Sequence, residues 1–391
     1  MVGHLSRRGA LLGLGSAVSL GRVSLAIAAA PTDRRFVVVL LRGALDGLAA
    51  VAPYGDAAFA GFRGGLAPEA GGLLDLGGFY GLHPALAGLH GMYAAGELLP
   101  VHAVAGPVRT RSHFEAQDVM ESGAEQRLSS GWLNRAVQDL ALAGPNGAPL
   151  SVGVALPLLL RGPTVVGAYA PQSFQAPQAD LYARLAALHA GDPVTGPAIR
   201  EGLQERGFTG AQLSGDAGGK GGERYAFPAL AGAAGRLLAA ADGPRIAAME
   251  LGGWDTHAQQ AQRLQGPLRQ LDAGLVALRD ALGAAWRQTA VLVITEFGRT
   301  VAMNGTGGTD HGTGTVAFVA GGAVSGGRVL ADWPGLAPGQ LLEGRDLQPS
   351  LDLRALAKGL LASHLRLPAA ALARAFPGSG QVTPAAGLIR A

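Results

Sequence analysis

The sequence predicts an α/β fold in which helices flank a mostly parallel central sheet. Three features support this fold class: continuous apolar runs recur along the chain, helical patterns separate them, and acidic or histidine side chains lie next to them. The runs cover residues 36–41, 99–105, 245–251, 290–295 and 315–320. Continuous aliphatic runs are typical of strands that are buried on both faces. Their alternation with helices favours a parallel sheet.

The clearest helix follows His257. Its leucines alternate in spacing between four and three residues, so they form one apolar stripe along the helix. The stripe consists of Leu264, Leu268, Leu271, Leu275, Leu278 and Leu282. We expect this stripe to pack against the sheet as a crossover helix rather than to form a coiled coil. Pro267 lies inside the stripe, so the helix is expected to kink or to begin there.

Residues 1–30 are predicted to be a twin-arginine signal peptide. Arg7 and Arg8 precede a weakly apolar run over residues 9–20, and residues 26–28 form an A-x-A cleavage pattern. The run is too short to span a hydrocarbon core of roughly 30 Å. A glycine-rich run after an arginine pair favours the twin-arginine route, with an ordinary secretory signal as the alternative. We therefore expect a periplasmic or secreted protein.

The remainder, residues 31–391, is expected to form a single domain. A glycine- and proline-rich turn signal near its middle suggests an insertion or cap around residues 145–240. We expect no transmembrane segment in the mature chain, because no later stretch reaches eighteen uncharged apolar residues.

Composition and charge exclude several classes of protein. The net charge of +3 comes from Arg7, Arg8 and Arg22, and the rest of the chain is balanced, which gives no support for binding to nucleic acid. The chain has no cysteine, which excludes thiolate catalysis, disulfides and zinc-thiolate sites. It also contains neither a G-x-S-x-G nucleophile elbow nor an H-E-x-x-H motif.

Chemistry-bearing side chains gather next to the predicted strands. In open α/β sheets, functional groups lie beyond the carboxyl ends of the strands. The segments at these positions hold four carboxylates and three histidines, namely Asp46, Asp255, Glu296, Asp310, His113, His257 and His311. Such a set suits one or two divalent ions. Asp255 and His257 are especially apt, because an acid and an imidazole on one tight turn can reach a common ion.

The segment after the second run offers candidate catalytic groups. Ser112 opens a predicted helix, where a nucleophile gains the favourable helix dipole, and His113 follows it. Arg111 and Arg299 are suited to bidentate binding of an anionic group. Structural alternatives stay open: Asp46 as a turn cap, Ser112 with Glu115 as a capping box, and His113 and both arginines as surface residues.

Taken in order, these segments resemble the bacterial domain-of-unknown-function family 1501, many of whose members carry twin-arginine signals. The matching pieces are LRGALDGL, RSHFEAQDVMESG, SGWLNR, GGWDTH, TEFGRT and GTDHG, which span about residues 36–330. The family is related to the alkaline-phosphatase and sulfatase superfamily. The resemblance therefore implies an alkaline-phosphatase-like α/β sandwich with a metal cluster at the strand ends.

The resemblance also implies roles for the acids and histidines. Asp46 matches the superfamily's first aspartate ligand. Asp255 and His257 match the acid and histidine of a metal site, and His311 resembles the last histidine ligand. One ion is thus expected from these last three residues. The side chains left for a second ion are Asp46, Glu296, Asp310, and Ser112 or His113. Glu296 departs from the superfamily pattern, because Phe297 follows it where a histidine is usual.

The expected function is an exported metallohydrolase that acts on an anionic phosphate or sulfate ester. Ser112 is the expected nucleophile, with Thr110 as a substitute, and Arg111 or Arg299 would stabilise the transferring oxygens. The expected cofactor is one or two divalent ions of zinc, manganese or calcium. The alternatives are a non-catalytic exported protein that keeps the fold for a structural role or for protein partners that the sequence does not identify, and a serine esterase without metal.

Overall fold

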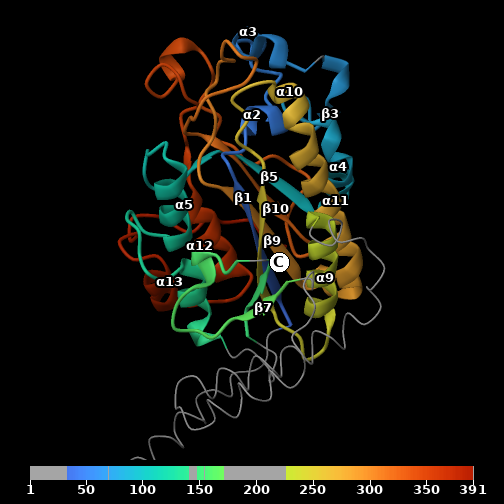
Figure 1. The fold of residues 1–391 in the computed structure, drawn as a ribbon, viewed down its shortest axis with the longest axis vertical. Helices are drawn as coiled ribbons and strands as arrows, with labels where there is room; N and C mark the ends of the chain where they lie inside the picture. Colours follow the sequence, from blue (N-terminus) through green and yellow to red (C-terminus); the bar gives the residue numbers. More distant parts are fainter. Residues whose placement is uncertain (1–32, 69, 141–147, 154, 171–225, 391) are drawn as a thin grey trace, which may run out of the picture.

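The computed structural model describes residues 33–68, 70–140, 148–153, 155–170 and 226–390. At its centre lies an eight-stranded sheet in the order β11-β5-β10-β9-β1-β8-β6-β7 (Figure 1). The predicted signal peptide over residues 1–30 falls outside the described residues.

All five predicted strands are present. They are β1 (Arg35–Arg42), β5 (Leu98–Ala105), β8 (Ile246–Gly252), β9 (Thr289–Thr295) and β10 (Thr315–Ala320). Three short strands that the sequence did not predict complete the sheet: β6 (Leu150–Val152), β7 (Gly167–Tyr169) and β11 (Leu351–Asp352). The mixed α/β class with a large, mostly parallel sheet is therefore confirmed.

One strand runs against the others. β1 pairs in parallel with β8 and β9, whereas β10 is antiparallel to both of its neighbours, β9 and β5. The start of β10 therefore lies at the same edge of the sheet as the carboxyl ends of β1, β5, β8 and β9. The segment that precedes β10 meets the segments that follow the other strands.

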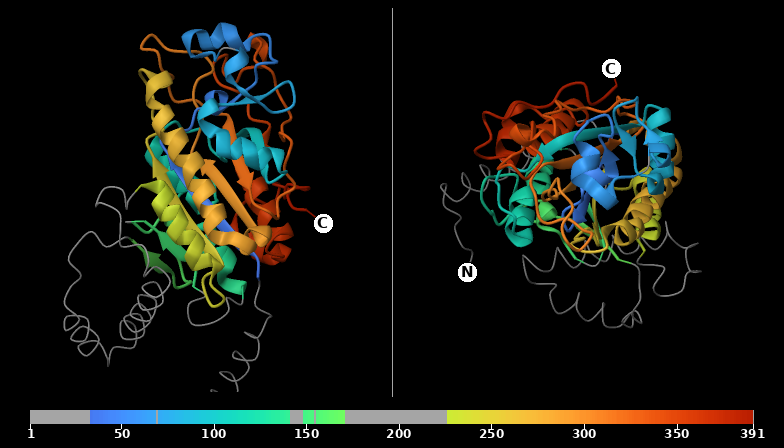
Figure 2. Two further views of the ribbon diagram at one scale, coloured as in Figure 1. Left: turned by 90° about the vertical axis from the view of Figure 1, so that its right-hand side faces the viewer. Right: turned by 90° about the horizontal axis from the view of Figure 1, so that it is seen from above.

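Helices cover both faces of the sheet (Figures 1 and 2). One face carries α4 (Ala87–Ala94), α9 (Phe227–Ala239) and α11 (Gln265–Leu282). The other carries α5 (His113–Ser122), α6 (Trp132–Ala136), α12 (Leu353–Ser363) and α13 (Ala369–Ala375). Along β1, Val37, Val39 and Leu41 pack on the first side, and the residues between them pack on the second. This alternation explains why the strand is apolar throughout.

The leucine stripe forms the buried face of α11, as predicted. Leu268, Leu271, Leu275 and Leu278 are fully buried. A short helix, α10 (Gln260–Arg263), precedes α11, and Pro267 lies in the first turn of α11, where its missing N–H leaves no intrahelical bond unmade.

A smaller layer lies beyond the carboxyl edge of the sheet, at the top of Figure 1. It contains a three-stranded sheet in the order β2-β4-β3, with bounds Val51–Ala52, Gly81–Leu82 and Leu74–Asp75. Helices α2 (Gly47–Ala50) and α3 (Phe59–Arg63) accompany it.

The described parts of the predicted insertion around 145–240 contribute to the central layers. β6 and β7 extend the main sheet, and α9 packs along α11. Gly274 on α11 faces Phe227 on α9 so closely that a Cβ there would lie 2.2 Å from the ring. Residues 145–147, 154 and 171–225 lie outside the described residues.

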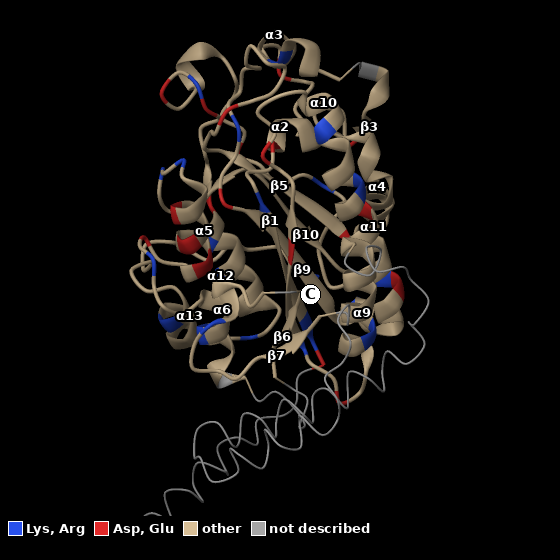
Figure 3. Ribbon diagram, viewed as in Figure 1, with Lys and Arg blue, Asp and Glu red and all other residues tan. Residues whose placement is uncertain are grey.

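The surface agrees with the balanced charge of the chain. Figure 3 shows basic and acidic residues scattered along the ribbon rather than gathered in one part of it. Among the described residues, no helix has the length and apolar character that crossing a bilayer requires.

We expect acid to destabilise the fold through His102. This β5 residue is buried, its Nε2–H donates to the Val51 carbonyl (2.9 Å), and its Nδ1 accepts from the Ala103 N–H (2.9 Å). Burial lowers the pKa of His102 to about 4. The unfolded chain binds this proton below about pH 6.5, so stability falls as the pH drops from there towards the folded-state pKa. The loss by pH 5 should be roughly 2 kcal/mol.

Urea unfolding at pH 7 and pH 5 measures this loss. The variant His102→Gln should lose less stability between the two pH values than the wild type does. His90→Gln, at a half-buried histidine outside the core, should behave as the wild type. An equal loss in His102→Gln and the wild type would show that this residue is not the source.

Candidate metal centre

Four loops meet at the carboxyl edge of the sheet. His113 is the first residue of α5, which follows β5, whereas Asp255 and His257 follow β8. Glu296 follows β9 directly, and His311 precedes the reversed strand β10. The structure therefore gathers side chains that are up to 198 residues apart in the chain.

The Nε2 atoms of His113 and His257 both point at the Nε2 of His311. The Nε2 of His311 lies 3.0 Å from the Nε2 of His113 and 3.0 Å from the Nε2 of His257. The carboxylate of Asp255 closes the group. Its Oδ1 lies 3.0 Å from His257 Nε2 and 3.4 Å from His311 Nε2, and its Oδ2 lies 3.6 Å from His113 Nε2.

The opposite ring nitrogen of each histidine faces a hydrogen-bond acceptor. The Nδ1 of His113 lies 2.8 Å from Glu296 Oε1, and that of His311 lies 2.9 Å from the Arg111 carbonyl. The Nδ1 of His257 lies 3.1 Å from Asp310 Oδ1. Because carboxylates and carbonyls only accept, each Nδ1 carries the proton and donates. In the neutral rings, the three Nε2 atoms are then unprotonated lone pairs.

Lone pairs that converge in this way would be stabilised by a cation between them. A proton on His113 can satisfy one contact, since the hydrogen bond to Glu296 raises the pKa of His113, while burial lowers the pKa of His311. When His257 is neutral, the contacts of its Nε2 with His311 and Asp255 set acceptor against acceptor. Histidines whose Nδ1–H groups are held by carboxylates or carbonyls are the usual partners of a bound metal.

The separations around His311 are close to those between ligands of a tetrahedral ion. Ligands at about 2.0–2.1 Å from a zinc ion lie about 3.3–3.4 Å from one another. His311 Nε2 lies 3.0 Å from His113 Nε2 and 3.4 Å from Asp255 Oδ1, and His113 Nε2 lies 3.6 Å from Asp255 Oδ2, so these three residues form a set whose ligand atoms all lie within 4.8 Å of one another. His257 Nε2 lies 3.0 Å from both His311 Nε2 and Asp255 Oδ1 and is the fourth candidate ligand. The donor set of three nitrogens and one oxygen suits zinc or manganese, whereas calcium prefers six to eight oxygens.

Glu296 is a buried hub rather than a member of the converging group. Its Oε1 accepts from the Gly43 N–H (2.9 Å), His113 Nδ1 (2.8 Å) and Gln117 Nε2 (2.9 Å), and its Oε2 accepts from Thr295 Oγ1 (2.9 Å). Burial by itself would raise the pKa of Glu296, but these bonds lower it overall. Glu296 therefore stays charged and orients His113.

Gly43 makes this arrangement possible. Its φ is +120°, and a Cβ there would lie 2.7 Å from the Asp255 backbone nitrogen. Only glycine lets the turn after β1 approach the ligand loop this closely.

Arg299 and Asp310 support the group from outside. The guanidinium of Arg299 is buried, and its Nη1 donates to Asp255 Oδ1 (2.6 Å). Burial would raise the pKa of Asp255, but Arg299 lowers it overall. Asp310 accepts from Asn304 (3.1 Å) and from His257, and these bonds lower the pKa of Asp310.

Asp46 lies apart from the converging atoms. Its Oδ1 caps α2 by accepting from the Leu48 and Ala49 N–H groups (both 3.1 Å). Its Oδ2 accepts from Arg63 and from Gln260 Nε2. The structure therefore gives Asp46 the cap role that the sequence left open, together with a buried ion pair.

The structure also places the candidate catalytic groups. Ser112 is exposed and precedes His113, but its side chain does not cap α5, and Glu115 accepts from Thr110 instead (2.8 Å), so no capping box forms. The side chain of Arg111 pairs with Asp346 (2.8 Å) and Glu343 (2.7 Å). The arginine pair expected to hold an anion is thus already engaged with carboxylates.

The family to which the chain belongs was identified by comparison with known proteins. Residues 102–376 match the family described as "Protein of unknown function (DUF1501)". The chain belongs to this family. No curated protein matches it. A solved structure with some similarity is the C-terminal periplasmic domain of EcEptC from Escherichia coli in complex with zinc. It has 9% identity and a TM-score of 0.32, and the match covers 74% of this chain and 72% of that one. Because the TM-score is this low, neither fold nor ligand is transferred from it.

Sequence reasoning missed several residues of this DUF1501 centre. Gln117 lies one helical turn after His113, so its place on the same face of α5 was a readable signal. Gln260, Thr309 and Asn304 carry no comparable signal, because single neutral residues form no motif and their partners come from distant segments.

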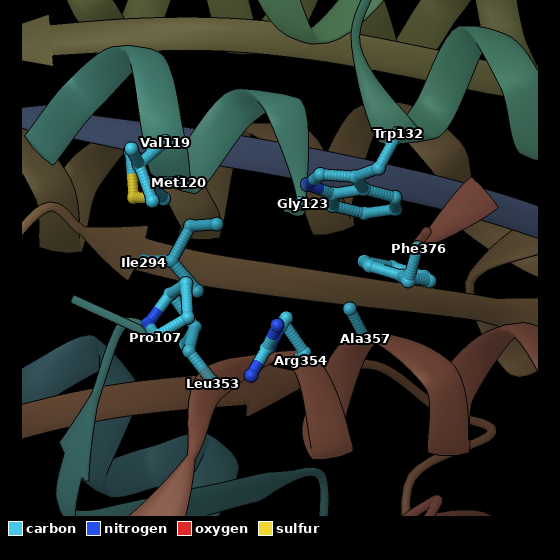
Figure 4. A pocket seen from close by; sticks show the side chains of 10 residues that line it. All are labelled: Pro107, Val119, Met120, Gly123, Trp132, Ile294, Leu353, Arg354, Ala357 and Phe376. Atoms are coloured by element: carbon cyan, nitrogen blue, oxygen red, sulfur yellow. The ribbon is translucent and has the colours of Figure 1, made fainter. Parts of the chain in front are cut away.

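A separate apolar pocket lies away from the converging atoms, between the sheet and the helices of the second face (Figure 4). Its lining includes Met120 on α5, Trp132 on α6 and Arg354 on α12. None of the candidate metal ligands lines it, so this pocket is not part of the centre.

The geometry predicts one divalent ion per chain. Protein purified without chelators and reconstituted with zinc should contain one equivalent by elemental analysis. The double variant Asp255→Ala/His257→Ala should lose it, whereas His90→Ala, at a half-buried histidine away from the centre, should keep it. Two equivalents in the wild type would contradict the single-ion centre, and none would contradict metal binding altogether.

Proposed function

We propose that this chain is a hydrolase that depends on one divalent ion, held by His113, His257, His311 and Asp255. The observation that carries the proposal is the convergence of three imidazole lone pairs whose opposite nitrogens are locked as donors. The centre is also open to solvent, since the side chains of Asp255 and His257 are each 45% exposed. A substrate can therefore reach it.

The proposed substrate is a phosphate or sulfate ester. A bound divalent ion would polarise the ester oxygen. Ser112 is the proposed nucleophile, because it is exposed and lies next to His113 at the start of α5. Its Oγ would form a bond to phosphorus or sulfur as the ester alcohol leaves, and its proton would pass to solvent or to the leaving oxygen. Water would then cleave the serine ester and restore the hydroxyl.

The arginines have supporting roles in this proposal. Arg299 holds Asp255 in place, and its guanidinium is too buried to reach outward. Arg111 contributes through its backbone, because its carbonyl fixes the tautomer of His311. We propose that neither arginine binds the substrate directly.

One observation favours a second, non-catalytic function. If all four residues bound the ion, they would complete a tetrahedral shell, and a closed shell is typical of structural zinc, whereas catalytic zinc keeps one position open. In that case the ion would stabilise the loops at the carboxyl edge. Turnover of any ester that depends on the ion decides between the two functions.

Export by the twin-arginine route is also proposed. Arg7 and Arg8, the weakly apolar run over residues 9–20 and the small residues at 26–28 support it. In a bacterial host with this pathway, the wild type should appear in the periplasm with its leader removed. The double variant Arg7→Lys/Arg8→Lys should stay in the cytoplasm, and Arg22→Lys should be exported. Equal export of the lysine pair would indicate an ordinary secretory signal instead.

The nucleophile is tested with Ser112→Ala. On a panel of phosphate and sulfate esters, this variant should lose at least about 100-fold in kcat/KM, because the covalent step is removed. Its zinc content should equal that of the wild type, since Ser112 is not a ligand. Ser350→Ala, at another exposed serine, should retain full turnover.

The other outcomes separate the alternatives. Full turnover by Ser112→Ala would reject this serine as the nucleophile. Turnover that resists chelators would indicate a metal-free serine esterase. Zinc binding without turnover on any ester would support the structural function.

A further inference from the structure

A chain of buried hydrogen bonds runs from Asp46 to the ligand Asp255. Gln260 Nε2 donates to Asp46 Oδ2 (2.5 Å), and Gln260 Oε1 accepts from Thr309 Oγ1 (2.6 Å). Thr309 Oγ1 in turn accepts from Arg299 Nε (3.2 Å). Arg299 Nη1 then donates to Asp255 Oδ1 (2.6 Å). These contacts link the cap of α2 to the metal centre through three side chains.

The carboxylate of Asp46 sets the direction of the whole chain. A carboxylate only accepts, so the NH₂ group of Gln260 must face it, and the amide oxygen must face Thr309. The Thr309 hydroxyl therefore donates its only proton to Gln260. Its lone pairs are then free to accept from the guanidinium of Arg299. A flipped amide would set an oxygen against the carboxylate.

Burial makes this chain hard to replace with water. Asp46, Gln260, Thr309 and Arg299 are each no more than 1% exposed. Arg299 donates to both the hydroxyl and the carbonyl of Thr309, so the guanidinium is held in one orientation, with its Nη1 directed at Asp255. Asp255, by contrast, is 45% exposed and would otherwise sample several rotamers in solvent.

We propose that Thr309 is a positioning residue for the metal centre. Its hydroxyl fixes Arg299, and Arg299 fixes the carboxylate of Asp255 at the position where it closes the ligand group. This inference rests on the metal site of the proposed function. It adds to the candidate ligands a residue that does not touch the ion but holds one ligand in place.

The test compares three variants by zinc affinity, measured in competition with a chromogenic chelator. Thr309→Val removes the hydroxyl and keeps the side-chain shape. It should weaken zinc binding by about 10- to 100-fold, as loss of an outer-shell partner typically does. Thr309→Ser restores the hydroxyl and should bind nearly as tightly as the wild type.

Thr289→Val is the matched control. Thr289 is also fully buried, and its hydroxyl donates to the Ala285 carbonyl (2.9 Å) at the opposite end of β9. It undergoes the same chemical change away from the centre, so its zinc affinity should equal that of the wild type. Wild-type affinity in Thr309→Val, or an equal loss in Thr289→Val, would overturn the positioning role.

A second readout does not depend on the metal. The NMR signal of the Arg299 Nε–H is identified by its loss in Arg299→Lys. This proton should exchange slowly with solvent in the wild type and in Thr309→Ser. It should exchange quickly in Thr309→Val. If the wild type binds no zinc, the proposed function fails, and the exchange rates alone decide whether Thr309 orients Arg299. Unchanged protection in Thr309→Val would reject that orientation.

Discussion

The candidate centre depends on one buried carboxylate, that of Glu296. A charge in the interior is tolerated only when its oxygens are fully hydrogen-bonded. The donors come from the turn after β1 (Gly43), from β9 itself (Thr295) and from α5 (His113 and Gln117). Leaving the charge unpaired would cost several kcal/mol, so these three segments are held together at one point. The orientation of His113 follows from this constraint.

The direction of β10 is the second constraint. Had β10 been parallel, the segment before it would lie at the opposite edge of the sheet, about 20 Å away for a strand of six residues. Because β10 is reversed, His311 arrives at the same edge as Asp255 and His257. The reversed direction of one strand therefore brings residues next to five strands together at one edge of the sheet.

The long strands and the leucine-striped helix could be predicted because their signal is local. Residues 36–41 are apolar without interruption, and burial on both faces requires this. The direction of β10 was not predictable in the same way, since a buried apolar run reads alike in both directions. The short strands β6, β7 and β11 have two or three residues each, too few for a periodic pattern.

The site was predictable to the extent that its ligands share a turn. Asp255 and His257 were expected to meet His311, and the structure brings them together. His113 was expected mainly as a catalytic group, but it lies among the candidate ligands, because its Nδ1 donates to Glu296 and its Nε2 then points towards His311. Asp46 was expected as a ligand, but its carboxylate accepts hydrogen bonds from Arg63 and Gln260 instead. Neither residue stands near it in the sequence.

These pairings also bear on how many ions the edge can hold. A second ion needs carboxylate oxygens that are free of other hydrogen bonds, and two of the three acids expected to provide them, Asp46 and Glu296, have none. Asp46 is fully occupied by two backbone N–H groups, Arg63 and Gln260, and Glu296 by four donors. At Asp46, the buried guanidinium of Arg63 already supplies the positive charge that a second ion would bring. Displacing it would leave a cation unpaired inside the protein, so Asp46 offers no free oxygen to a second ion.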